Sequence, residues 1–292
     1  MRDFWPNLRG ALLRVFPDCL TQAQASAFGM FLSFFPLLLL SLGVLTSSHR
    51  LGGALDELLL GLRQILPPGS QHLLSDFLAD HPLHPWRWTL LGLFGTLLGG
   101  TQVMTGLMEG FRVAYHESFT IRPPYWRLQA RAVALLLVTL APGIVAVGVS
   151  VFGKQLRHWM ILKFGLAGLF DVLWTVVHIG LAFVLAILIL ALLYRVGHAE
   201  RLGWNQVLPG AVVATLLWWA VNATFGFYVT HMPYSVVYGG LATAIGLLIW
   251  MNLSAVVILI GSAYNAESQA RGNAAGAGPS LPAGTPPVKA PA

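Results

Sequence analysis

The chain has 292 residues, of which 56% are hydrophobic and only 10% are charged, whereas a soluble domain carries roughly 25% charged residues. Because so few charges could not cover a compact soluble surface, the composition excludes a soluble enzyme, a secreted disulfide scaffold and a disordered chain. The net charge of +6 comes from single Lys and Arg residues scattered between apolar runs. That pattern is typical of charges that flank membrane spans and indicates no nucleic-acid partner.

The segment 1–23 combines apolar and basic residues before the first long apolar run. Its apolar members, interspersed with arginines, are Phe4, Trp5, Leu8, Leu12 and Val15. We expect this segment to form an amphipathic helix on the cytoplasmic face of the membrane.

Six apolar stretches are long enough to cross a bilayer, which takes about 20 helical residues. They run over Gln24–Thr46, Trp88–Gly110, Ala132–Phe152, Val172–Tyr194, Val207–Val229 and Gly239–Tyr264. The third is interrupted by Pro142-Gly143. The sequence therefore predicts an all-α, polytopic membrane protein with a six-helix transmembrane domain over 24–265.

The connections set the orientation and carry two further features. Eleven of the 17 Lys and Arg residues fall on the side of the N-terminus, which predicts that both termini are cytoplasmic. The first outer loop, 47–87, has leucines at helical spacing and predicts amphipathic helices. The segment 266–292 turns to Gly, Ala, Pro and Ser, so we expect a cytoplasmic tail without order.

Polar groups inside a bilayer are costly, and each one is a candidate for function. The candidates for a substrate path are Ser33, Pro36, Gln102, Glu109, Asp171, His178, Asn222, Tyr234, Tyr238 and Asn252. A lipid in a cavity lined by Ser33, Gln102, His178 and Asn222 would favour transport, whereas tight packing would favour a scaffold.

Each of the first candidates also has a structural interpretation. Pro36 should bend its helix, and transporters often place a substrate at a broken helix, although such kinks are common and serines tie helices together. Gln102 and Glu109 share one helix face with Thr105. Glu109 could bind a proton or a cationic group, or it could pair with Arg112, three residues along.

The remaining candidates divide in the same way. Asp171 and His178 share a face on the fourth span and could pass a proton, or His178 could be a neutral packing residue. Asn222 and Asn252 should hydrogen-bond across helices at their depth. Glycine pairs in the second span, Gly95/Gly99 and Gly106/Gly110, could mediate homo-oligomers or pack internally.

Two motifs resemble the YihY/BrkB family of bacterial inner-membrane proteins. One is the small-residue-rich stretch from Ala25 with a Ser33-x-x-Pro36 core, and the other runs from Tyr234-Ser-Val-Val-Tyr238-Gly239-Gly through Trp250 to Gly261-Ser-Ala-Tyr-Asn-Ala-Glu267. The resemblance covers about 10–268 and implies an inner-membrane location. It also implies an association of some members with virulence, while an old family label implies a ribonuclease.

Our leading hypothesis is a protein that binds or transports a hydrophobic or amphipathic substrate such as an envelope lipid. The alternative is a non-transporting scaffold for envelope assembly. An enzyme or membrane-associated ribonuclease is the least favoured, because the sequence holds no paired carboxylates with a basic groove, no Ser/His/Asp elbow and no phosphate-binding loop. We expect no cofactor and no metal, and the expected partners are the bilayer and a lipid or amphipathic small molecule.

Overall fold

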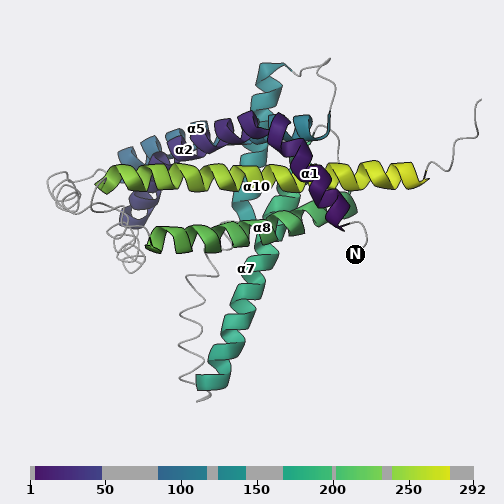
Figure 1. The fold of residues 1–292 in the computed structure, drawn as a ribbon. Helices are drawn as coiled ribbons and strands as arrows, with labels where there is room; N and C mark the ends of the chain where they lie inside the picture. Colours follow the sequence, from purple (N-terminus) through teal and green to yellow (C-terminus); the bar gives the residue numbers. More distant parts are fainter. Residues whose placement is uncertain are drawn as a thin grey trace, which may run out of the picture.

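The computed structural model describes residues 4–47, 85–116, 124–142, 167–198, 202–231 and 239–276. Within these ranges the chain is helical and holds no strand. The helices are α1 (Phe4–Asp18), α2 (Leu20–Ser47), α5 (Pro85–Ala114), a helix over 125–142, α7 (Ala167–Gly197), α8 (Trp204–His231) and α10 (Gly239–Gly276). Figure 1 shows α8 and α10 side by side, with α7 leaving them at a steep angle.

Five of these helices are long and apolar enough to cross a membrane. The segments are Leu20–Ser41, Trp86–Ala114, Ile179–Gly197, Trp204–Phe227 and Ala244–Ala274. The protein is therefore an all-α, polytopic membrane protein, as the composition predicts. The predicted third span is helical over 132–142, as part of a helix that already begins at 125. The rest of that span lies outside the described residues. The outer loop 47–87 also lies outside the described residues, except for residue 47 at the end of α2 and residues 85–87 at the start of α5.

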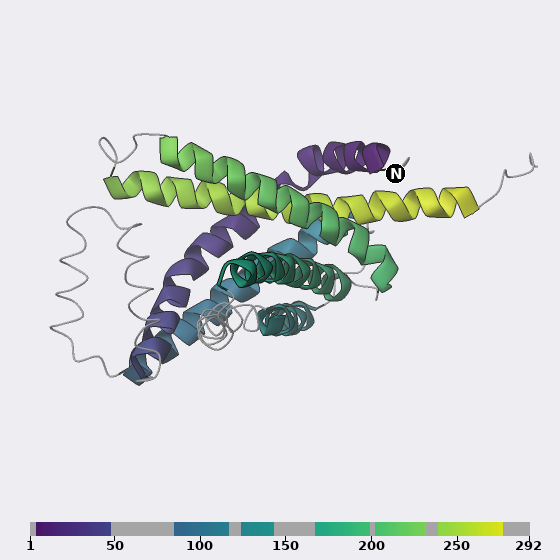
Figure 2. The same cartoon turned by 90° about the horizontal axis from the view of Figure 1, so that it is seen from below.

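The helices α2 and α5 pack along a seam of small residues. The facing pairs are Ser26–Gly106, Gly29–Val103, Ser33–Gly99, Pro36–Gly95, Leu40–Gly92 and Gly43–Thr89. Residue numbers rise along α2 as they fall along α5, so the two helices are antiparallel. The α2 positions alternate in steps of three and four, which is the spacing of a coiled-coil seam. Because most of the α5 positions are glycine, the two backbones approach closely. Figure 2 shows the pair lying side by side.

The helices α8 and α10 form a second antiparallel pair, joined by side-chain hydrogen bonds. The amide of Asn265 accepts a hydrogen bond from the Gly210 N–H at 2.7 Å and donates one to the Val207 carbonyl at 3.2 Å. Trp250 Nε1 donates to Asn222 Oδ1 at 2.9 Å. From α7, the Tyr194 hydroxyl donates to the Ile258 carbonyl of α10 at 2.8 Å. Polar side chains therefore fix the register of this half.

The structure has the expected N-terminal helix, α1, which packs on the C-terminal part of α10 (Figure 1). Arg14 of α1 binds Glu267 of α10, and Arg271 Nη2 donates to the Pro6 carbonyl at 3.1 Å. These contacts hold α10 against α1 as far as Arg271, and the helix ends at Gly276. We expected a tail without order to begin at 266, and this boundary is wrong. Composition alone does not show that α1 packs on the segment after 266 and stabilises it as a helix.

The ends of several helices meet at one place, which we call the basic end. The contacts that bring them together join α1 to α5 and α10, α7 to α5, and α8 to α10. Tyr125 and Leu128, at the start of the 125–142 helix, lie near Glu109 and Arg112 of α5. The described arginines at this end are Arg9, Arg14, Arg112, Arg127, Arg131, Arg195 and Arg271.

Candidate functional site

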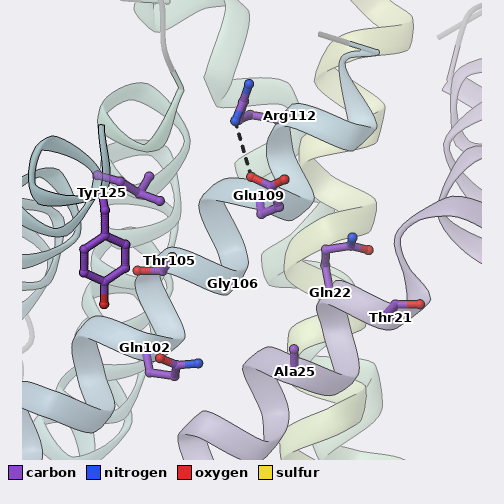
Figure 3. Close-up of a pocket in the computed structure, with 10 residues that line it drawn as sticks. Thr21, Gln22, Ala25, Gln102, Thr105, Gly106, Glu109, Arg112 and Tyr125 are labelled. Atoms are coloured by element: carbon purple, nitrogen blue, oxygen red, sulfur yellow. Dashed lines mark hydrogen bonds and ion pairs between the residues drawn. The ribbon is translucent and has the colours of Figure 1, made fainter. Parts of the chain in front are cut away.

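An open cavity of about 500 Å³ lies between α2, α5 and the start of the 125–142 helix. We call it the α2–α5 groove. Its lining residues are Thr21, Gln22, Ala25, Gln102, Thr105, Gly106, Glu109, Arg112, Tyr125 and Leu128. Figure 3 shows that they come from all three helices. Most of these side chains are polar, although the groove is set between helices that are mainly apolar.

One face of α5 supplies the polar floor of this groove. Gln102, Thr105 and Glu109 follow each other at helical spacing, and all three line the cavity (Figure 3). The Arg112 Nη1 atom lies 3.4 Å from Glu109 Oε2, so the groove contains an ion pair between residues three positions apart. Thr105 donates a hydrogen bond to the Thr101 carbonyl at 2.9 Å, which occupies its hydroxyl proton within the helix.

A second polar cluster at the basic end centres on Glu267. The Arg14 Nη2 atom lies 2.5 Å from Glu267 Oε1, and Arg14 Nη1 donates to the Ala114 carbonyl at 3.0 Å. Arg271 Nε lies 3.8 Å from the other Glu267 oxygen. Arg14 therefore joins α1, the end of α5 and α10, and this cluster closes the end of the helices without forming part of the groove.

Two titratable residues are buried at the basic end, just outside the membrane-spanning segments. His198 stacks on Phe111 with centroids 5.4 Å apart, and its Nδ1 lies 2.8 Å from the Tyr194 carbonyl oxygen. Burial lowers the pKa of His198 below its ordinary value, because a charged imidazole would lose its water there. Burial likewise raises the pKa of the Cys19 thiol to about 11, with a smaller contribution from Asp18.

Two predicted path residues lie in the α2–α5 seam and do not line the groove. The Ser33 hydroxyl donates to the Gly29 carbonyl at 2.6 Å, and its side chain contacts Gly99. Pro36 contacts Gly95 of α5. The helix α2 continues on both sides of Pro36. Hydropathy gives the depth of such residues but does not show which helix they face.

The structure describes three of the four residues that would line the predicted cavity, and it places them at different sites. Of the four, Gln102 lines the groove, whereas Ser33 lies in the seam. Asn222 lies in the α8–α10 pair, where it bonds Trp250 across the helices and donates to the Trp218 carbonyl at 2.7 Å. This is the cross-helix hydrogen bond expected for an asparagine at that depth.

The other candidates have less structural description. Asn252 is half-buried on α10. Asp171 and His178 belong to α7, but their side chains lie outside the described residues, as do Tyr234 and Tyr238.

The sequence reasoning missed three residues that organise the basic end. Asn265 is fully buried and bonds α8, and it stands inside the Gly261–Glu267 motif without having been assigned a role. Arg14 was counted only as a charge that sets orientation, and His198 was not singled out. The sequence signal for this role of Asn265 was the pair Pro209-Gly210 on α8. A proline and a glycine in a helix leave room for a side chain from a neighbouring helix.

Comparison with known proteins assigns the family. A family model described as Virulence factor BrkB matches residues 16–283. The chain belongs to the BrkB family. The resemblance carried by the Ser33–Pro36 and Gly261–Glu267 motifs is thereby confirmed.

Relatives within the BrkB family are distant but cover most of this chain. It is 28% identical over 247 residues to the ribonuclease-like protein YfkH of Bacillus subtilis (strain 168), covering 82% of this chain and 86% of that protein. It is 26% identical over 270 residues to a UPF0761 membrane protein of Alkalilimnicola ehrlichii and 28% identical over 253 residues to one of Laribacter hongkongensis. These alignments cover 89% and 85% of this chain but only 58% and 57% of those proteins. No solved structure matches the chain.

Proposed function

We propose that this BrkB-family protein binds an amphipathic molecule, such as an envelope lipid, in the α2–α5 groove and moves it between membrane leaflets. The observation that carries this proposal is an open cavity of about 500 Å³ among apolar helices that polar and apolar groups line together, including Gln102, Thr105 and Glu109. Polar side chains that line a cavity at membrane depth are costly unless a ligand or water uses them. An uncharged or zwitterionic cargo fits better than an ion, because rings of charge are absent from this lining.

We further propose a bacterial inner-membrane location with both termini in the cytoplasm. The described arginines of the chain ends and of the second and fourth connections gather at the basic end, as the positive-inside rule requires of a cytoplasmic face. The start of α2 and the end of α10 also meet there, so the number of crossings between them is even. We assign the sixth crossing to the helix that begins at 125, in addition to the five candidate spans.

The scaffold hypothesis receives less support from the glycine-rich faces. Gly95, Gly99 and Gly106 all contact α2, and Gly110 contacts Leu259 of α10. These glycines are therefore used within one chain. A homo-oligomer would therefore have to form through other surfaces.

We do not extend the ribonuclease-like name of the Bacillus relative to this protein. Hydrolysis of a phosphodiester needs a positioned base and acid. Glu109 is the one carboxylate among the ten described lining residues, it already pairs with Arg112, and no histidine accompanies it. We therefore propose a non-enzymatic role. Nuclease activity that survives stringent purification and is lost in Glu109→Gln would contradict this conclusion.

Transport can be tested with purified protein in vesicles. Fluorescent phospholipids in one leaflet should become accessible to an external quencher faster than in empty vesicles. Thr105→Trp, which fills the groove, should slow this movement, whereas Leu216→Trp on the exposed face of α8 should not. If no phospholipid or amphipathic solute in a broad panel moves or binds, the proposal is wrong. Stable envelope proteins recovered by cross-linking would then favour the scaffold.

A further inference from the structure

The groove continues along α2 as an exposed apolar stripe. Thr21 and Ala25 line the groove, and the same helix face continues away from the basic end with Phe28, Leu32 and Phe35. These steps of four and three residues keep one face of a helix in line. Each of the three apolar side chains is more than half exposed. The α2 face is therefore polar and open at the basic end and apolar beyond it.

The neighbouring helix α5 repeats this arrangement in the opposite chain direction. Glu109, Thr105 and Gln102 line the groove, and the same face continues with Leu98 and, two turns on, Leu91. Both leucines are more than half exposed. Since α5 is antiparallel to α2, the polar part of each face lies at the same end.

The two faces lie on the same side of the helix pair. Each flanks the α2–α5 seam, and residues of both line one cavity, which fixes their common side. The apolar stripe, consisting of Phe28, Leu32, Phe35, Leu91 and Leu98, therefore extends directly from the groove. Its length suits an acyl chain, while the groove at its end suits a polar headgroup.

The charges of the groove indicate which headgroup fits. Among the described lining residues, Glu109 carries the negative charge and Arg112 the positive charge, so their sum is zero. Their 3.4 Å separation places a carboxylate acceptor and a guanidinium donor within reach of one small group. A guanidinium binds phosphate through paired N–H donors, and a carboxylate accepts hydrogen bonds from an ammonium group.

We infer that the groove and the apolar stripe form one binding site for a zwitterionic phospholipid, with its phosphate at Arg112, its ammonium group at Glu109 and an acyl chain along the stripe. This inference rests on the proposed function and names its substrate class. An anionic phospholipid would meet the Glu109 carboxylate without an ammonium group to offset it. That mismatch gives the site its selectivity.

The test compares two lipids with identical acyl chains and different headgroups. Purified protein is titrated with dioleoyl phosphatidylethanolamine and with dioleoyl phosphatidylglycerol in detergent micelles, and bound lipid is counted by native mass spectrometry. Phosphatidylethanolamine should bind at least about tenfold more tightly, the scale expected for one charge-assisted contact. Glu109→Gln should remove or reverse this preference, and Arg112→Gln should weaken both lipids. Asp18→Asn and Arg127→Gln remove the same charges at exposed positions of the basic end and should change neither.

A second pair of variants tests the acyl chain. Leu32→Ala shortens the stripe, and Leu216→Ala removes a similarly exposed leucine from α8. Only the first should weaken phosphatidylethanolamine binding, by about threefold or more for the apolar surface lost. Equal retention of both lipids, unchanged by Glu109→Gln and Leu32→Ala, would show ordinary boundary lipid and overturn the inference.

The two proposals fail separately. Selective binding that depends on Glu109 without movement between leaflets would contradict transport and leave the lipid site in place. Movement of phospholipid without a headgroup preference would support transport and contradict the zwitterionic site.

Discussion

Asn265 offers the sharpest test of how the α8–α10 pair is held together. Its side chain is fully buried and makes two hydrogen bonds to the backbone of α8, at 2.7 Å to Gly210 N–H and at 3.2 Å to the Val207 carbonyl. Asn265→Leu keeps the number and branching of the side-chain heavy atoms and removes both bonds. Comparison with the same substitution at another position of α10 therefore reports the polar contribution.

The expected cost follows from two opposing estimates. A buried hydrogen bond contributes about 0.5–1.5 kcal/mol, which gives about 1–3 kcal/mol for two bonds. Hydrogen bonds between membrane helices average only about 0.6 kcal/mol, because the separated helices find other partners. We expect the larger range here, since Gly210 and Gly261 approach closely and leave no room for a replacement partner. At about 2–4 °C per kcal/mol, the melting temperature should fall by roughly 2–12 °C.

The assay is thermal unfolding of the purified protein in one detergent, followed by helical circular dichroism. Asn252→Leu is the matched control, because Asn252 lies on the same helix and is only half-buried. It should change the melting temperature little. If Asn265→Leu unfolds no earlier than Asn252→Leu, the hydrogen bonds to α8 do not stabilise the pair and our reasoning is refuted.

Three further predictions concern packing and protonation. Gly210→Ala should destabilise the protein by about 1–3 kcal/mol, because its new Cβ would meet Gly261 and Asn265. Gly180→Ala is the control, because nothing lies within 4 Å of the new Cβ, and it should be neutral or stabilise the protein by up to about 1 kcal/mol. Thermal unfolding measures both. The thiol of Cys19, whose pKa is raised to about 11, should react slowly with iodoacetamide at pH 8. The double variant Asp18→Cys/Cys19→Ser moves the cysteine to the exposed position 18 and should react far faster. Equal rates would contradict the burial of Cys19. Because burial lowers the pKa of His198, the unfolded chain takes up the proton first as pH falls below about 6.5, so stability should decline with acid and decline less in His198→Gln; identical melting profiles between pH 8 and pH 5 would refute this.

The sequence predicts the helices well because their signal is local. A bilayer imposes a length and an apolar composition on each span, and both can be counted along the chain. The shared face of Gln102, Thr105 and Glu109 was predictable for the same reason, since helical spacing alone brings them together. The groove they line depends on α2 and on the 125–142 helix, whose positions no local pattern gives.

The roles of Ser33 and Pro36 could not be read from the sequence. A serine and a proline near the middle of a span suit a broken helix beside a substrate as well as a packed seam. The difference lies in the partner helix, where Gly95 and Gly99 receive their side chains. These contacts, Ser33 with Gly99 and Pro36 with Gly95, follow only from the antiparallel packing and register of α2 and α5.

Polar residues in the membrane thus divide according to what satisfies them. Asn222 and Asn265 are bonded to Trp250 and to the α8 backbone, and substitution should affect them through stability. Gln102 and Glu109 face an open cavity, and substitution there should affect ligand binding more than folding. A residue of the first group that changed lipid selectivity without changing stability would contradict this division. Measuring both properties on each variant therefore tests whether the groove residues bind the proposed ligand.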